Sequence, residues 1–125
     1  MFDVTVCSAK GEALRRFDLS RLLETGARAV IGRAEDCDIR IKSPAISRHH
    51  CVIEIDDGDW IVRDMGSSRG TFVEGVQISE AAVVAGLEVV IGPAVLRFAL
   101  APTTVTSIGA ELRRERRRVW NRHRA

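Results

Sequence analysis

The chain has 125 residues, of which 46% are hydrophobic and 29% charged, a composition typical of one globular domain with its own core. No apolar run is long enough to cross a bilayer as a helix, and the N-terminus lacks a signal-peptide pattern, so we expect a cytoplasmic protein. The net charge of +2 hides a division, because residues 110–125 carry seven arginines and two glutamates while the preceding chain is mildly acidic.

Short segments of alternating polarity predict strands through the first half of the chain. These segments are residues 2–7, 14–19, 27–32, 39–42 and 51–55, and residues 20–25 predict a single helical turn. Ser43-Pro44 ends the fourth strand, because proline lacks a backbone donor and restricts the residue before it. Residues 56–59, with the sequence DDGD, predict a β-hairpin into the next strand because Asp and Gly tolerate positive φ.

The second half continues the same pattern. Strands are predicted at residues 60–64, 71–73, 76–78, 88–91 and 94–100, with a tight turn at Glu74-Gly75 and a connecting loop at 79–86. About ten short strands, with no long helix before residue 107, predict an all-β sandwich or barrel.

We assign residues 1–102 to this β domain, which Pro102 ends, and residues 103–125 to a linker and an arginine-rich tail. The tail is a short basic segment for which a helix is one alternative. Its apolar stripe is thin, so we do not expect it to dock firmly on the body.

Three polar clusters interrupt the predicted strands and concentrate arginines and hydroxyls on loops. They are Gly32-Arg33, residues 47–50 with the sequence SRHH, and residues 66–70 with the sequence GSSRG. Arginine and serine on such loops suit the binding of an anion such as phosphate, if the three loops converge. The candidate anion-binding residues are Arg33, Ser47, Arg48, Ser68 and Arg69.

The segment GSSRG also matches the G-x-S-x-G nucleophile elbow of hydrolases, with Ser68 as nucleophile. His49, His50 and Asp64 are the potential partners of a triad. An elbow requires a strand before the serine and a helix after it, whereas residues 71–75 predict a β-hairpin. We therefore predict no catalytic residue and no enzyme.

Neither the histidines nor the cysteines show metal-ligand spacing. His49 and His50 are adjacent and face opposite sides of an extended segment, with no third ligand at a useful spacing. Cys7, Cys37 and Cys51 are scattered, which fits reduced thiols, and the first and last lie in predicted strands as buried side chains. We expect no metal and no cofactor.

In their order along the chain, the polar motifs resemble the forkhead-associated (FHA) domain. The family pattern of Gly-Arg, Ser-x-x-His and Asp-x-x-Ser-x-x-Gly-Thr-x-x-x-Gly is matched by Gly32-Arg33, by residues 47–50 and by residues 64–75. With the strand pattern, the resemblance covers residues 2–100. It implies a two-sheet β-sandwich of about eleven strands whose loops at one end bind phosphothreonine peptides.

The resemblance also implies a role for each matching residue. Arg33 and Ser47 grip the phosphate, Ser68 helps to hold it, and Arg48 lies beside the peptide or phosphate. The residues implied to support the site are Gly32, His50 and Gly70, of which His50 braces the Ser47 loop.

Two positions depart from the family pattern, since Arg69 and Glu74 stand where asparagine is common. The family asparagine at the first position holds the main chain of the peptide, and arginine donates hydrogen bonds but cannot accept them. Arg69 is instead a second cation for the phosphate or for an acidic residue beside it. It also motivates the alternative function, a phospho-independent interaction or scaffold domain on the same fold.

The implied partner is a phosphothreonine-containing protein, such as a substrate of a Ser/Thr kinase. For residues 113–124 three alternatives stand: a solvated segment, contact with nucleic acid, or contact with an anionic membrane. Trp120 favours a membrane-proximal segment if the chain continues beyond residue 125. The sequence does not predict the oligomeric state.

Overall fold

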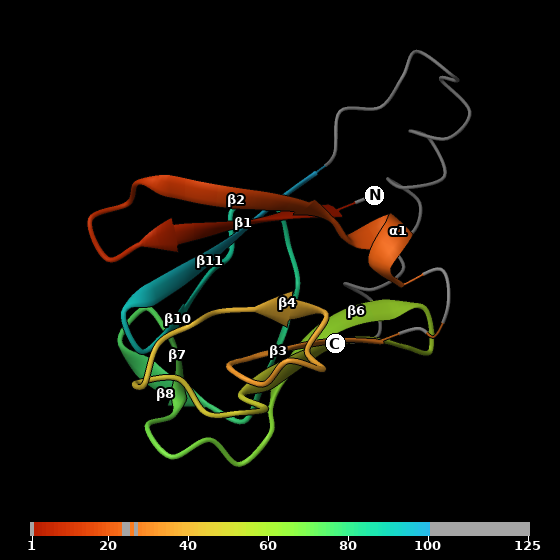
Figure 1. Cartoon of the computed structure of the whole chain (residues 1–125). Coiled ribbons are helices and arrows are strands. Elements are labelled where there is room, and N and C mark those ends of the chain that lie inside the picture. The colour runs from red at the N-terminus through yellow and green to blue at the C-terminus, as the bar shows by residue number, and fades with distance from the viewer. Residues whose placement is uncertain (1, 24–25, 27, 101–125) are drawn as a thin grey trace.

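The computed structural model describes residues 2–23, 26 and 28–100, and strands make up just over half of these residues (Figure 1). Eleven strands and one short helix occur in these residues. They are β1 Phe2–Ser8, β2 Ala13–Asp18, α1 Leu19–Leu22, β3 Arg28–Gly32, β4 Ile39–Arg40, β5 Cys51–Asp56, β6 Asp59–Asp64, β7 Thr71–Val73, β8 Val76–Ile78, β9 Glu80–Ala82, β10 Glu88–Ile91 and β11 Ala94–Leu100.

The strands form two sheets, which confirms the predicted β-sandwich. One sheet has the order β2-β1-β11-β10-β7-β8 and the other the order β4-β3-β5-β6-β9. Neighbouring strands are antiparallel except β3 and β4, which pair in parallel. Figure 1 shows the sheet of β1, β2 and β11 facing the sheet that carries β3, β4 and β6.

Two tight turns confirm the hairpins that were predicted from Asp-Gly and Glu-Gly. Asp57 and Gly58, with φ of 52° and 82°, join β5 to β6, whose residues Asp56 and Asp59 pair. Glu74 and Gly75, with φ of 49° and 78°, join β7 to β8. Two central residues with positive φ match the right-handed twist of the flanking strands.

The prediction of a connecting loop at 79–86 is wrong, because β9 lies within it. Residues Glu80–Ala82 pair with Arg63, Val62 and Ile61 at the edge of β6. Arg63 Nε also lies 3.5 Å from a carboxylate oxygen of Glu80. The segment has weak strand propensity and becomes a strand because β6 offers an unpaired edge.

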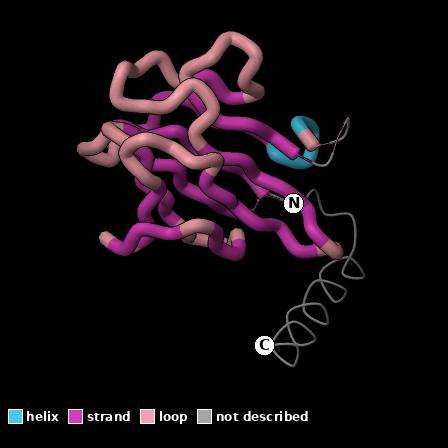
Figure 2. Tube along the Cα trace, turned by 90° about the horizontal axis from the view of Figure 1, so that it is seen from below, coloured by secondary structure: helices cyan, strands magenta, loops and turns pink. Residues whose placement is uncertain are grey.

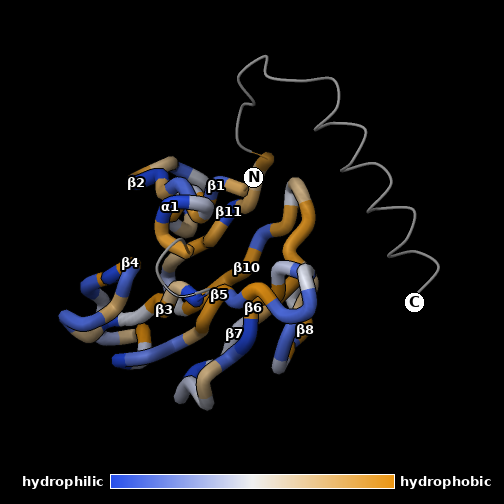
Figure 3. Tube along the Cα trace, turned by 90° about the vertical axis from the view of Figure 1, so that its right-hand side faces the viewer, coloured by the Kyte–Doolittle hydropathy of each residue, from blue (hydrophilic) through white to orange (hydrophobic). Residues whose placement is uncertain are grey.

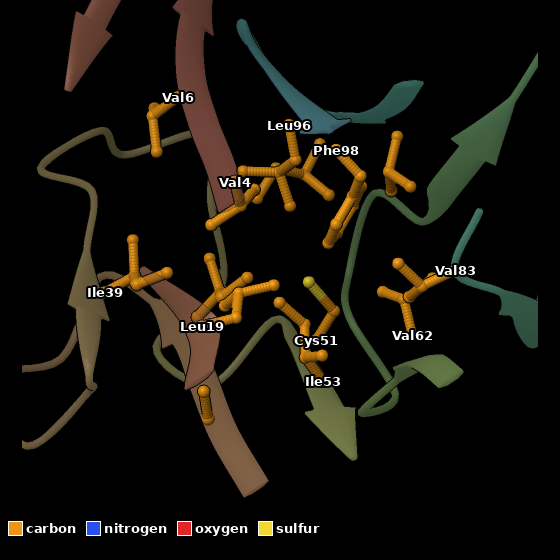
Figure 4. Packing of buried hydrophobic residues seen from close by; sticks show 14 of the residues in the cluster. Val4, Val6, Leu19, Ile39, Cys51, Ile53, Val62, Val83, Leu96 and Phe98 are labelled. Carbon is orange, nitrogen blue, oxygen red and sulfur yellow. The ribbon is translucent and has the colours of Figure 1, made fainter. Parts of the chain in front are cut away.

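The core lies between the two sheets (Figure 4). Val4 and Phe98 come from the six-stranded sheet and Ile53 and Val62 from the five-stranded sheet, and all four are fully buried. Leu19, the first residue of α1, closes one end of the core, and Asp18 is the N-cap of this helix. Burial of these apolar groups fixes the strands and leaves the loops outside.

The predicted burial of two cysteines is confirmed, since Cys7 and Cys51 are both 0% exposed. Cys37 is partly exposed, and all three thiols are free. Among the described residues, no helix has the length and apolarity that a membrane span needs. The predicted domain boundary at residue 102 and the basic tail lie outside the described residues.

Candidate functional site

Ser47 joins the three polar loops at one end of the sandwich. These loops are the β3–β4 loop (residues 33–38), the β4–β5 loop (41–50) and the β6–β7 loop (65–70). The Ser47 carbonyl accepts a hydrogen bond from the Arg33 amide at 3.0 Å, and its Oγ accepts one from the Ser68 amide at 3.0 Å. The loops therefore converge, and Figure 2 shows most of the loop segments gathered away from α1.

The fully buried side chain of His50 connects two of these loops through hydrogen bonds. Its Nδ1 accepts a hydrogen bond from the Ser47 amide at 3.2 Å, so Nε2 carries the proton and donates to the Gly70 carbonyl at 2.9 Å. A neutral imidazole satisfies both bonds, and His50 thereby connects the β4–β5 loop to the β6–β7 loop.

Gly32 and Gly70 occupy positions at which a side chain does not fit. A Cβ on Gly32 would lie 2.2 Å from the Arg48 carbonyl oxygen, so only glycine lets β3 pass so close to the β4–β5 loop. Gly70 has φ of +90°, and a Cβ there would lie 2.9 Å from Gln77 Nε2.

Asp64 organises the β6–β7 loop and was not among the predicted site residues. One carboxylate oxygen accepts from the Ser67 and Thr71 hydroxyls at 2.5 and 2.7 Å, and the other from the Gly66 and Ser67 amides at 3.0 and 3.1 Å. Burial raises the pKa of Asp64, but these hydrogen bonds outweigh burial and hold the pKa below its ordinary value. The signal was present in the sequence, since an Asp followed by Gly two residues later and Ser three residues later favours such a turn.

The arginines of the loops differ from those of the sheets in their partners. On the sheets, Arg63 bonds to Glu54 at 2.8 Å and Arg97 to Glu88 at 2.9 Å. In the loops, Arg33 donates through Nε to the Ile46 carbonyl at 3.1 Å.

None of the described residues accepts a hydrogen bond from the two terminal nitrogens of Arg33. The exposed side chains of Arg48 and Arg69 likewise have no carboxylate partner within the described part of the chain. Guanidinium groups at this end are thus available to an external anion.

A basic pocket opens beside Arg33. It is lined by Arg33, Arg40, Lys42, Ser43 and Pro44, with no acidic residue among them. Arg40 and Lys42 were missed as site residues, although their alternation with Ile39 and Ile41 already placed them on the outer face. Figure 3 shows hydrophilic colour over much of the chain near β4, whereas β10 is coloured as hydrophobic.

The geometry around Ser68 differs from that of a nucleophile elbow. The residues after it form β7 and β8, not a helix, as predicted. His49 bonds to Asp36 at 2.9 Å, and the buried His50 uses both ring nitrogens on backbone groups. Neither histidine bonds to Ser68.

The fold and the loops together define a β-sandwich domain with a cluster of loop arginines and serines at one end. The chain belongs to the FHA family, since the family model for the FHA domain matches residues 29–92. The resemblance predicted from the sequence is thereby confirmed. FHA domains are interaction modules rather than enzymes.

Comparisons with individual proteins agree with this family. The chain is 34% identical over 83 residues to the glycogen accumulation regulator GarA of Mycolicibacterium smegmatis, which is 66% of this chain and 52% of GarA. The curated relatives are longer than the parts matched, which span from 2% to about half of their lengths.

Many solved structures are similar in fold, and two of them share 26% sequence identity with this chain. The FHA domain of CT664 from Chlamydia trachomatis has a TM-score of 0.64 and 26% identity, covering 81% of this chain and 98% of that domain. EmbR of Mycobacterium tuberculosis, in complex with a low affinity phosphopeptide, has a TM-score of 0.60 and 26% identity, covering 82% of this chain and 25% of EmbR.

Proposed function

We propose that this chain is a phosphothreonine-peptide recognition module that mediates phosphorylation-dependent protein–protein interaction in signalling. The observation that carries the proposal is the convergence of three loops on Ser47, which places Arg33, Ser47 and Ser68 at one end of the sandwich. FHA domains act in phosphothreonine-dependent interactions, and the partner we propose is a phosphothreonine-containing protein.

The phosphate is held by the groups that the loops leave available. Arg33 is anchored through Nε, which leaves its two terminal nitrogens to donate charge-assisted bonds to phosphate oxygens. Ser47 Oγ accepts from the Ser68 amide, so its own hydroxyl proton is free to point at the anion. The Ser68 hydroxyl, Arg48 and Arg69 lie on the same loops and complete the proposed set.

Gly32, His50 and Gly70 support the site without touching the peptide. Because Gly32 has no side chain, the Arg48 carbonyl can lie close to it. His50 forms hydrogen bonds with the Ser47 amide and the Gly70 carbonyl. These supporting contacts hold the phosphate-binding side chains in position before the ligand binds.

We also infer that the chain does not catalyse a reaction. The histidines bond to Asp36, to the Ser47 amide and to the Gly70 carbonyl, which leaves Ser68 without a base in the described part of the chain. A serine hydroxyl without such a base is a weak nucleophile.

The test is calorimetric titration of the chain with a phosphothreonine peptide, drawn from a degenerate library, and with its unphosphorylated twin. We expect binding of the phosphorylated peptide only, and Arg33→Ala to weaken it by about 2–3 kcal/mol, because a charge-assisted bond to the phosphate is lost. Arg21→Ala, which removes the same charge from α1, is the matched control and should bind as the wild type does.

Equal binding of both peptides would favour the alternative, a phospho-independent interaction domain that uses the same loops. Loss of binding in Arg33→Ala together with loss of the folded circular dichroism spectrum would instead indicate damage to the fold. In that case Ser47→Ala is the second variant, and it must weaken binding for the proposal to stand.

A further inference from the structure

We propose that Asp36, Cys37 and His49 form a binding site for a divalent transition metal ion, with Zn²⁺ as the preferred occupant. Spacing along the chain predicted no metal site, because His49 has no third ligand near it in sequence. Folding supplies the ligands from the β3–β4 loop. One ligand atom from each residue lies within 4.8 Å of the others.

The distances between His49 and Asp36 are close to those of a tetrahedral site, and the Cys37 sulfur lies within 4.8 Å of both residues. His49 Nε2 lies 2.9 Å from Asp36 Oδ1 and 3.1 Å from Oδ2. Bonds of about 2.0–2.3 Å to a central zinc ion separate tetrahedral ligand atoms by about 3.3–3.8 Å. Small movements of these side chains therefore convert the present His49–Asp36 hydrogen bond and the Cys37 thiol into a coordination sphere.

The ligand types select the metal. A thiolate, an imidazole and a carboxylate together suit zinc, whereas magnesium and calcium prefer oxygen ligands alone. Three protein ligands leave a fourth position for water. On binding, the thiol of Cys37 gives up its proton to solvent and the sulfur forms the metal bond.

The backbone around the three residues is already in place without a metal. The Ala34 amide donates to the Arg48 carbonyl at 3.0 Å, and the Cys37 amide donates to the Ala34 carbonyl at 3.1 Å. The Cys37 thiol donates to the same Arg48 carbonyl at 3.1 Å. The β3–β4 loop is thus packed on the β4–β5 loop, which holds Cys37 beside His49.

The charges around Cys37 also favour a cation. The carboxylates of Asp36 and Asp38 lie near the Cys37 sulfur, and Arg40 is the nearby group of opposite charge. A bound divalent ion offsets this negative field and stabilises the thiolate. The site does not use the proposed phosphate contacts, so it stands or falls separately from peptide binding.

The test uses the full chain, stripped of metal with a chelator and kept reduced, and titrated with Co²⁺ as a spectroscopic probe for zinc. We expect one equivalent to produce thiolate-to-metal charge-transfer absorption and the visible bands of a tetrahedral ion, and Zn²⁺ to displace it. Zinc should also raise the melting temperature, because it binds only the folded arrangement of the three ligands.

Three variants assign the ligands and one provides the control. Cys37→Ala should abolish the charge-transfer absorption, and Asp36→Asn and His49→Ala should each weaken zinc binding at least about tenfold. His123→Ala, which removes a histidine of the tail, should bind as the wild type does. Absence of a thiolate band at one equivalent, or a band that persists in Cys37→Ala, would overturn the proposal.

Discussion

Single residues determine how closely the loops of this FHA domain approach one another. The missing side chain of Gly32 leaves space for the Arg48 carbonyl. The buried His50 ring links two loops through hydrogen bonds to the Ser47 amide and the Gly70 carbonyl. Asp64 gathers four donors onto one carboxylate. The proposed phosphate contacts depend on these residues even though none of them need touch the ligand.

Gly32→Ala adds a single methyl group but should displace the β4–β5 loop and lower the stability of the domain. The new methyl group would meet the Arg48 carbonyl at 2.2 Å, so the β4–β5 loop must move away from β3. We expect a loss of about 2–4 kcal/mol in unfolding free energy, measured by urea denaturation, because a backbone clash cannot relax as a flexible side chain does. Gly26→Ala, with open space around its Cβ, is the control, and an equal loss there would refute the steric explanation.

Asp64→Asn should change how stability depends on pH. The pKa of Asp64 is lower in the folded protein than in the unfolded chain, where it is about 3.9. The contribution of the ionised carboxylate to stability is therefore fully present above the unfolded pKa and is lost as pH falls through the folded pKa. At pH 7 the variant should lose about 1–3 kcal/mol, because an amide cannot accept all four hydrogen bonds. The difference in unfolding free energy between the variant and the wild type should become smaller below about pH 4. A difference that stays constant as pH falls would contradict a stabilising role of the ionised Asp64 carboxylate.

Hairpin turns set the register of the strands that carry the loops. The Glu74-Gly75 turn holds Val73 opposite Val76, so β7 continues directly from the site into the edge strand β8. Strand β4 contributes only two residues, yet its parallel pairing with β3 places Arg40 next to the basic pocket. Short elements therefore orient the site, whereas the long strands β1 and β11 provide core.

Gly75→Ala tests the turn without a steric clash. Nothing lies within 4 Å of a Cβ at this position, but φ is +78°, a conformation that costs an L-residue about 1 kcal/mol or more. We expect a loss of about 1 kcal/mol in thermal or urea unfolding. Gly26→Ala, also in open space, lacks this strain, and equal effects of the two substitutions would show that φ is not the cause.

The partners of the arginines differ between the sheets and the loop end of the described domain. Arg63 and Arg97 on the sheets bond to carboxylates, whereas Arg33, Arg48 and Arg69 at the loop end have no carboxylate partner among the described residues. A terminal nitrogen of Arg40 lies 3.9 Å from a carboxylate oxygen of the exposed Glu35, and this long, exposed ion pair is weak. The loop end is therefore the side of the described domain at which we propose that a phosphorylated peptide binds.

This distribution predicts that phosphopeptide affinity falls as salt is added. Screening acts over about 10 Å at 0.1 M ionic strength, so exposed arginines lose most of their attraction for the phosphate. Arg69→Asn should reduce the salt dependence, measured by calorimetry between low and high salt, because one cation is removed. Affinity that does not change with salt would show that these arginines do not contact the phosphate.

Much of this protein follows from its sequence. Alternation of apolar residues indicated which side of several strands faces the core, because the strand period of two places Val4, Ile53 and Phe98 inside. Asp57-Gly58 and Glu74-Gly75 determined two hairpins, because positive φ is accessible there. The polar motifs also indicate the FHA family, to which the chain belongs.

Only the tertiary structure decided which distant groups meet. Glu80–Ala82 became a strand because β6 has a free edge, and no local propensity indicates that. Asp36 and Cys37 reach His49, and Arg33 and Ser68 reach Ser47, because hydrogen bonds between loop backbones fix the approach of segments more than ten residues apart. Sequence spacing describes positions along the chain, whereas binding geometry depends on how the two sheets pack and where their loops then lie.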